Sequence, residues 1–366
     1  MKLDKVQIQH FRNLQDVVVL PSPNLNFIFG QNGSGKSSFL EALHYLGFGR
    51  SFRTSKQKNV INNEKQSFSI FCQLSVDVDI LKLGISRDKE DLVTVSINGE
   101  KSNRLSEFVS HVPVQIFTPQ SADVILGSPS LRRRFIDWGL FHVEQSFSKT
   151  SQEYAKLLKQ KNALLKKIGK NYSSDDAHQM HFWDKQIVRV GEIITNMRYS
   201  YLEAIMGHIN DNLMHFLPEF SFEISYHRGW EKDAALQEAI FRKEEKDIKN
   251  GFLSVGPHKA DLKIKSQGID VAELLSRGQL RMLVAALQLA QVQYLSLKTS
   301  KSVVFLLDDI GAELDEVKRQ LFIDRLLLED TQLFITAIEK SQLSFIDKYK
   351  NKKMFHVEHG HMREEN

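Results

Sequence analysis

Gly30-Gln31-Asn32-Gly33-Ser34-Gly35-Lys36-Ser37 is the stretch that decides the fold of this chain, because it fits the pattern G-x-x-x-x-G-K-[ST]. Glycines let successive backbone N–H groups curl around phosphate oxygens, Lys36 reaches the β- and γ-phosphates, and Ser37 is a magnesium ligand. Residues 26–29, apolar after Asn26, lead into the loop as a strand, and apolar residues recur at helical spacing over 39–46. Strand, loop and helix together predict a nucleoside triphosphate site.

The residues expected to contact this nucleotide belong almost entirely to the loop. They are Gly30, Gln31, Asn32, Gly33, Ser34, Gly35, Lys36, Ser37 and Ser38. A loop of this kind needs a second strand that ends in an acidic residue. The apolar run 303–307 followed by Asp308 and Asp309 supplies it. We expect Asp308 to hold magnesium through water, and Asp309 to act as the base that orients the attacking water, with Lys36 as its catalytic partner. The alternative for Asp308 and Asp309 is an ordinary acidic turn after a buried strand.

The loop and the acidic pair are separated by most of the chain, which indicates an insertion between them. Residues 67–97 alternate with period two and end in Asn98-Gly99, a strong hairpin signal, so a β-meander is expected there. From about 130 to 217 the pattern is helical, with a polar break at 169–177, and this predicts an antiparallel pair of helices. The last third returns to alternating strands and helices.

The expected architecture is therefore an α/β ATPase head of the ABC/SMC-like phosphate-loop type, with a mixed β-sheet flanked by helices, a β-meander and an inserted helical lobe. The head would comprise residues 1–128 and 250–366, and the lobe residues 129–249. At 366 residues the chain is long enough for two such domains.

Composition narrows the function classes only a little. The formal charge of +4, from 49 basic and 45 acidic residues, is too near balance to indicate a polyanionic partner. The single cysteine, Cys72, excludes an internal disulfide, and its alternating apolar neighbours predict a buried strand residue. The longest apolar run is short and the first residues alternate charge with hydrophobe, so we expect no membrane span, no signal peptide and a cytosolic protein.

Two further motifs resemble those of ABC-type ATPases. Leu275-Ser276-Arg277-Gly278-Gln279 is similar to their signature, and the run from Asp308 to Asp315 is similar to their second acidic motif and D-loop. In that superfamily the signature contacts the nucleotide held by a second subunit, with the serine and a helix N-terminus as anion ligands. The resemblance implies an ATP-dependent homodimer that uses ATP and Mg²⁺, with Ser276, Arg277, Gly278 and Gln279 in the trans contact. Ser276 is also expected to be the N-cap of its helix.

Further stretches resemble the RecF family and together cover most of the chain. Phe11-Arg12-Asn13-Leu14, Gly49-Arg50-Ser51-Phe52-Arg53, Arg132-Arg133-Arg134-Phe135-Ile136-Asp137 and Gly256-Pro257-His258-Lys259-Ala260-Asp261-Leu262 carry the similarity. The resemblance implies an SMC-like head with a short helical lobe. It also implies a weak, DNA-dependent ATPase that binds gapped or junction DNA and helps to load the RecA recombinase with RecO and RecR in recombinational repair and SOS induction.

The same resemblance assigns individual residues. Arg12 would bind the nucleotide, and Gln120 would be the Q-loop residue that senses magnesium and the lytic water. Asp309 stands where ordinary ABC ATPases use glutamate, and Ala337 stands in the place of their switch histidine. These departures lead to the hypothesis of slow hydrolysis suited to a timed clamp.

Two basic clusters are candidates for DNA contact. Both lie in stretches without acidic residues. One follows the phosphate-loop helix and the other lies on the first predicted lobe helix: Arg50, Arg53, Lys56 and Lys58, then Lys156, Lys159, Lys161, Lys166, Lys167 and Lys170. Such clusters are usually solvated faces, and the family resemblance is what favours DNA. Contacts to phosphates would make the binding structure-directed, not sequence-specific.

Three alternatives stay open at this point. His356, His359 and His361 lie near the C-terminus without other ligands, which predicts a solvated tail in preference to a metal site. The three ATP motifs are shared with the nucleotide-binding subunit of an ABC-type transporter, whose helical insert docks on a membrane partner. An SMC-like protein that binds DNA without a recombinase partner is the other alternative, and only a partner experiment separates it.

Overall fold

The computed structural model describes residues 2–76, 79–168, 174–299, 301–310, 314–339, 348–349 and 351–365. Contacts between these residues divide the chain into two compact units. The first unit comprises Met1–Ser121 together with Ala285–Asn366, and the second comprises Ala122–Val284. The boundaries predicted from the sequence lie at 128/129 and 249/250. Residues 250–284 group with the inserted segment because they include a strand, 261–266, that pairs with strand 222–227.

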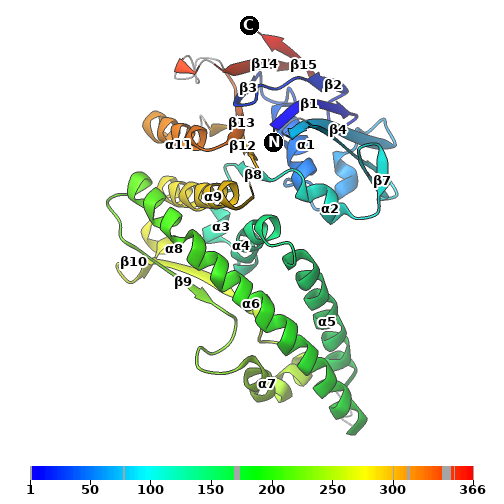
Figure 1. Ribbon diagram of the computed structural model, residues 1–366, viewed down its shortest axis with the longest axis vertical. Helices are drawn as coiled ribbons and strands as arrows, with labels where there is room; N and C mark the ends of the chain where they lie inside the picture. The colour runs from blue at the N-terminus through cyan, green and yellow to red at the C-terminus, as the bar shows by residue number, and fades with distance from the viewer. Residues whose placement is uncertain are drawn as a thin grey trace. The chain divides into compact units, whose positions relative to one another are not determined.

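The first unit contains the sheet that carries the phosphate loop. Its strand order is β15-β14-β3-β13-β12-β8, and all strands are parallel except β15. The bounds are β3 Leu25–Phe29, β8 Val114–Phe117, β12 Val303–Leu307, β13 Thr331–Ala337, β14 Lys352–Glu358 and β15 His361–Glu365. Every residue of β12 and β13 is buried, as expected for parallel strands covered on both faces. Helices α1 (Lys36–Phe48) and α11 (Glu316–Leu328), with the part of α9 (Arg277–Thr299) from Ala285 onward, complete the α/β layers of this unit (Figure 1).

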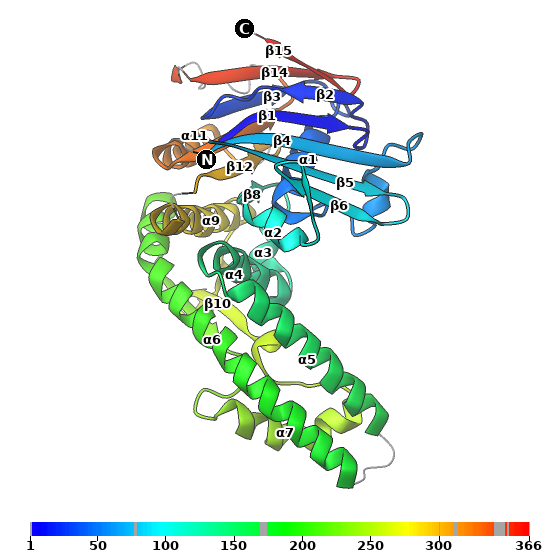
Figure 2. The same cartoon turned by 45° about the vertical axis from the view of Figure 1, so that its right-hand side comes forward.

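A second, antiparallel sheet in the same unit has the order β2-β1-β4-β5-β6-β7 (Figure 2). The strands are β1 Lys2–Gln9, β2 Asp16–Val19, β4 Ser67–Val76, β5 Asp79–Asp88, β6 Val93–Ile97 and β7 Glu100–Ser102. The predicted meander is confirmed, and Asn98 and Gly99 form its last turn with φ of 53° and 87°. Cys72 is fully buried on β4, as predicted, and burial raises the pKa of its thiol. The short helix η1 (Gln57–Val60) lies between α1 and β4, and α2 (Leu105–Ser110) leads from β7 to β8 of the first sheet.

The second unit is built around two long helices, α5 (Phe147–Ile168) and α6 (Ser174–Phe216), which lie side by side (Figure 1). Apolar residues at helical spacing along α6 are buried, with Ile187 and Val190 both fully covered. Around the pair are α3 Asp123–Leu126, α4 Pro129–Val143, α7 Leu236–Asn250, α8 Val271–Leu274, η2 Pro257–Lys259 and a sheet of β9 Phe222–His227, β10 Asp261–Ser266 and β11 Ile269–Asp270. The paired helices were predicted, whereas α7 and β9 were not.

The C-terminal residues correct one prediction. His356 lies in β14 and His361 in β15, so the segment is a hairpin in the first sheet and not a tail, while His359 and His361 are exposed as predicted. The physical reason is backbone pairing, because β14 adds to β3 in parallel from Lys352 to His356 and covers that edge. No helix in the described part of the chain is both long and apolar enough to cross a bilayer.

Candidate nucleotide-binding site

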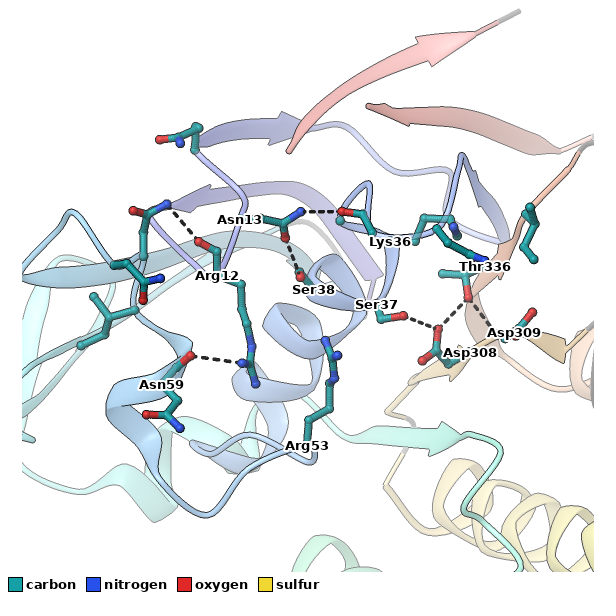
Figure 3. A pocket seen from close by; sticks show the side chains of 18 of the residues that line it. Arg12, Asn13, Lys36, Ser37, Ser38, Arg53, Asn59, Asp308, Asp309 and Thr336 are labelled. Atoms are coloured by element: carbon teal, nitrogen blue, oxygen red, sulfur yellow. Dashed lines mark hydrogen bonds between the residues drawn. The ribbon is translucent and has the colours of Figure 1, made fainter. Parts of the chain in front are cut away.

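The ends of three neighbouring parallel strands bring the two predicted motifs together. The phosphate loop follows β3, Thr336 lies near the end of β13, and Asp308 follows β12, with β13 between the other two strands. Carboxyl ends of parallel strands share one edge of a sheet, which is where α/β proteins bind ligands. Here they border a cavity of about 790 Å³ whose lining includes Lys36 and Asp308 (Figure 3).

The phosphate loop is held close to neighbouring backbone. A Cβ at Gly30 would lie 2.3 Å from the carbonyl oxygen of Val357, so only glycine fits there, and Gly35 has φ of 125° immediately before helix α1. The helix begins at Lys36, so the N–H groups of its first turn are directed toward the loop. Six of the nine predicted contacts line the cavity: Asn32, Gly33, Gly35, Lys36, Ser37 and Ser38.

Lys36 folds back over the loop. Its Nζ donates to the carbonyl oxygens of Gly30 at 2.5 Å and Gln31 at 3.0 Å. Partial burial lowers the pKa of Lys36, and the carboxylates of Asp309 and Asp308 oppose that shift. An ammonium group held against the phosphate loop is suited to binding a phosphate chain.

The acidic pair is joined to the loop through Ser37 and Thr336. Ser37 Oγ donates to Asp308 Oδ1 at 3.1 Å, and Thr336 Oγ1 donates to the same oxygen at 2.8 Å. The backbone N–H of Asp309 donates to Thr336 Oγ1 at 2.9 Å. Burial raises the pKa of Asp308, while the hydrogen bonds from Thr336 and Ser37 lower it. One carboxylate and one hydroxyl oxygen side by side are the ligand types that Mg²⁺ takes from proteins at nucleotide sites, so these residues fit that ion.

Thr336 was missed in the sequence analysis, which considered only its neighbour Ala337. The available signal was a hydroxyl residue near the end of a strand that is otherwise largely apolar. Thr336 is 1% exposed, so its hydroxyl is committed to Asp308 and Asp309. Asp309 itself has φ of 51°, an uncommon conformation for a residue other than glycine.

The opposite wall of the cavity holds arginines around a buried carboxylate. Arg12 donates from Nη2 to Glu41 Oε1 at 2.7 Å and from Nε to Oε2 at 2.9 Å, and Glu41 is fully buried. Arg53 Nη1 lies 3.6 Å from the same carboxylate. Arg12 lines the cavity, as its predicted role requires; Arg53, grouped with the DNA candidates, lines the cavity as well (Figure 3). Glu41 was not predicted, because a glutamate on a helix gives no sign of burial.

The turn after β1 also reaches the loop. Asn13 Nδ2 donates to the carbonyl oxygen of Gly33 at 3.1 Å, and Ser38 Oγ donates to Asn13 Oδ1 at 2.8 Å. Ser38, predicted to contact the nucleotide, is 6% exposed and uses its hydroxyl on Asn13. This hydrogen bond therefore connects the first turn of α1 to the turn after β1.

Gln120 is not brought to this cavity. It is exposed after β8, and its backbone N–H donates to Thr118 Oγ1 at 3.2 Å. Gln120 does not line the cavity that contains Ser37 and Asp308. The assignment of Gln120 to magnesium therefore has no support from the structure.

The signature segment begins helix α9. Gln279 N donates to Ser276 Oγ at 3.4 Å and Ser276 N donates to Gln279 Oε1 at 2.9 Å, the reciprocal bonds of a capping box, so the predicted N-cap is confirmed. Ser276 and Arg277 are exposed, and Gly278 is half-buried. Asp315 accepts from Lys318 N at 2.9 Å and caps α11, while residues 311–313 of the predicted D-loop run lie outside the described residues.

The basic candidates are mostly on the surface, with one correction. Arg50, Lys56, Lys58, Lys156, Lys159, Lys166 and Lys167 are exposed. Lys161 is 1% exposed and its Nζ lies 2.6 Å from Asp184 Oδ1, so its assignment to a DNA-binding surface was wrong. The reason is its position on the face of α5 that packs on α6. Lys170 lies outside the described residues.

Comparison with known proteins gives one family throughout. A family model described as RecF/RecN/SMC N terminal domain matches residues 2–363. A protein of Pseudoalteromonas atlantica named DNA replication and repair protein RecF is 58% identical over 365 residues, which are 100% of each chain. A protein of the same name from Shewanella woodyi is 38% identical over 98% of this chain and 97% of its own.

Solved structures agree with the sequence relatives. The recombination mediator protein RecF with ATP, described in the RecFOR pathway, has a TM-score of 0.89 and 27% identity over 100% of this chain and 98% of its own. An Smc head bound to the C-terminal winged-helix domain of ScpA has a TM-score of 0.60 and 16% identity over 100% of this chain and 97% of its own, which shows the fold alone. The predicted ABC/SMC-like head fold is confirmed, and these relatives speak against the transporter-subunit alternative.

Proposed function

Because this chain belongs to the RecF family, we propose that it is an ATP-dependent switch in DNA replication and repair. In this proposal ATP and Mg²⁺ bind in the cavity at the ends of β3 and β12, two copies associate, and the dimer holds gapped or junction DNA. It then helps to load a RecA-type recombinase together with proteins of the RecO and RecR type. The observation that carries the proposal is the convergence of Lys36, Ser37 and Asp308, from distant parts of the chain, in one cavity.

The residues of the cavity divide the chemistry between them. Backbone N–H groups of the loop and the Lys36 ammonium bind the phosphate chain, and Arg12 adds positive charge from the opposite wall. Ser37 and Asp308 would hold Mg²⁺, which supplies charge neutralisation on the phosphate oxygens when bound. Asp309 orients the attacking water and accepts its proton.

The rate of this step should be low. Aspartate at 309 has a side chain one methylene shorter than the glutamate of ordinary ABC ATPases, and Ala337 provides no side-chain donor or acceptor. Both features disfavour rapid turnover and suit a protein whose ATP-bound state persists. A wild-type turnover of many ATP per second in the presence of DNA would contradict this part of the proposal.

Association of two copies would complete each site. Ser276 is exposed at the start of the long helix α9, where the N-terminal N–H groups and the helix dipole favour an anion. In the proposed dimer, Ser276, Gly278 and Gln279 of one copy approach the γ-phosphate bound by the other. This arrangement makes dimerisation depend on ATP.

The DNA contacts would come from exposed basic side chains. Lys156, Lys159, Lys166 and Lys167 lie on α5, and Arg50, Lys56 and Lys58 follow helix α1. Lysine contacts to phosphates carry no base information, so the binding should be structure-directed and should weaken steeply as salt is raised. An affinity that does not change when salt is raised several-fold would contradict such a surface.

Three variants test the proposal together with wild type. We expect no response to ATP from Lys36→Met, ATP binding without dimer formation from Ser276→Arg, and a long-lived ATP dimer on DNA from Asp309→Asn. Sedimentation measures dimer formation, and fluorescence anisotropy of a labelled gapped duplex measures DNA binding. The proposal fails if wild type dimerises equally with and without ATP, or if Lys36→Met retains the ATP response.

A further inference from the structure

The C-terminal hairpin packs directly on the phosphate loop. Between β14 and β15 the chain turns at His359 and Gly360, and the backbone N–H of Gly360 donates to the carbonyl oxygen of Ser34 at 2.9 Å. Earlier in the hairpin, the carbonyl oxygen of Val357 lies 2.3 Å from where a Cβ on Gly30 would be. The hairpin therefore contacts both the first residue of the loop and its middle.

The same turn also contacts the segment that supports the loop from the other side. Gly360 has φ of 78°, and a Cβ there would lie 2.0 Å from the backbone carbonyl oxygen of Asn13. The Asn13 side chain in turn binds Gly33 O and Ser38 Oγ. Displacement of Asn13 would consequently be transmitted to the loop and to the first turn of α1.

These contacts are tight because each involves backbone, which cannot move aside as a long side chain can. Val357 is 1% exposed, and its Cγ1 would be 3.4 Å from a Cβ on Gly35, so its side chain also packs against the loop. A phosphate loop binds well only if its N–H groups are directed at the phosphates before the ligand arrives, since ordering a free loop costs affinity.

We propose that the hairpin turn at Gly360 is a positioning element of the nucleotide site, which holds the phosphate loop in its binding conformation through Ser34 and Asn13. The inference rests on the proposed ATP function and adds a structural requirement to it. ATP affinity should then depend on residues beyond position 350 that do not line the cavity.

The chain offers a matched control for a substitution at Gly360. Gly268, in the turn between β10 and β11, has the same φ of 78°, but a Cβ added there would meet no atom of the described residues within 4 Å. Gly268→Ala and Gly360→Ala therefore both place an alanine at φ of 78°, and only the second creates a contact with Asn13. Gly360→Asn is a further variant, because asparagine tolerates positive φ but still carries the clashing Cβ.

The experiment measures the Kd for ATP with Mg²⁺ by calorimetry and the Tm without nucleotide, for wild type and each variant. Loss of the bond to Ser34 should raise the Kd of Gly360→Ala about three- to tenfold, and Gly360→Asn should behave alike. Gly268→Ala should lower the Tm and leave the Kd unchanged. A wild-type Kd in either Gly360 variant, or an equal rise in Gly268→Ala, would overturn the proposal.

Truncation of Val357 keeps the test decisive if the Gly360 variants do not fold. Val357→Ala removes the Cγ1 atom that faces Gly35, and Val95→Ala, in the other sheet, is the control for loss of a buried valine. We expect a higher Kd only for Val357→Ala, and equal Kd values would sink the inference. If wild type does not bind ATP at all, the proposed function itself fails, which is a different result.

Discussion

Replacement of Thr336 by valine should impair hydrolysis without changing the shape of the core. Valine keeps the volume and removes only the hydroxyl, which donates to Asp308 Oδ1 at 2.8 Å and accepts from Asp309 N at 2.9 Å. The substitution therefore leaves a buried carboxylate with one donor fewer and a backbone N–H without its acceptor.

The magnitude follows from these two bonds. An orphaned buried donor costs about 1–3 kcal/mol, and a hydrogen bond to a charged group contributes about 1.5–3 kcal/mol. If about 1.5–3 kcal/mol of this loss appears in the transition state, where Asp308 and Asp309 must be aligned, the turnover falls roughly ten- to a hundredfold. Thr336→Ser restores the hydroxyl and should restore most of the rate.

The assay is steady-state ATP hydrolysis as a function of Mg²⁺ concentration, with ATP binding measured separately. We expect Thr336→Val to bind ATP, to need more Mg²⁺ and to turn over slowly at saturation. Wild-type turnover and Mg²⁺ dependence in Thr336→Val would refute the role of the hydroxyl. Equal impairment in Thr336→Ser would refute it too, because the loss would then come from packing.

Other predictions concern stability, pH and DNA. Lys161→Ala should lower the free energy of unfolding in urea by about 3–5 kcal/mol, because it leaves a partly buried carboxylate unpaired, whereas exposed Lys159→Ala should change it by under about 0.5 kcal/mol; equal effects would refute the buried pair. Burial lowers the pKa of His44 to about 3, so between about pH 6.5 and pH 3 the unfolded chain binds a proton that the folded chain does not. The free energy of unfolding should therefore fall by roughly 1.4 kcal/mol for each pH unit by which the pH is lowered in this range. Urea unfolding of His44→Phe should show a weaker loss between pH 6 and 5, and an unchanged loss would contradict this. Replacing Lys166 and Lys167 by glutamine should reduce the slope of log affinity against log salt by about 0.9 for each lysine that contacts duplex DNA; an unaltered slope in anisotropy titrations would remove them from the interface.

Local patterns predicted the elements that depend on near neighbours. The loop from Gly30 to Ser37, the apolar strand before Asp308 and the turn at Asn98-Gly99 are all set by short-range sterics and hydrogen bonds. The long helices α5 and α6 were predictable for the same reason, since an apolar stripe of helical period needs a partner face. The boundary near residue 250 was harder, because β10 pairs with β9 across an intervening helix.

The residues that were missed depend on pairing between distant segments. Glu41 is buried only because Arg12 and Arg53 reach it, and Thr336 reaches Asp308 only because β13 lies between β3 and β12. The sequence around a polar residue does not show which distant side chains will contact it in the fold. Lys161 illustrates the same limit, because its lysine-rich surroundings predict exposure while its helix face is covered by α6.

Phosphate binding could therefore be predicted from one continuous segment, because the eight consecutive residues from Gly30 to Ser37 supply the glycines, the ammonium and the hydroxyl. Long-range backbone pairing, of β14 with β3 and of β13 with β12, decided the rest. It set the strand order, placed Asp308 beside Ser37, and brought the turn at Gly360 to Ser34. Such pairing is selected by the burial of whole strand faces and by the closing of a sheet edge, and these are properties of the folded chain that no short stretch of residues encodes.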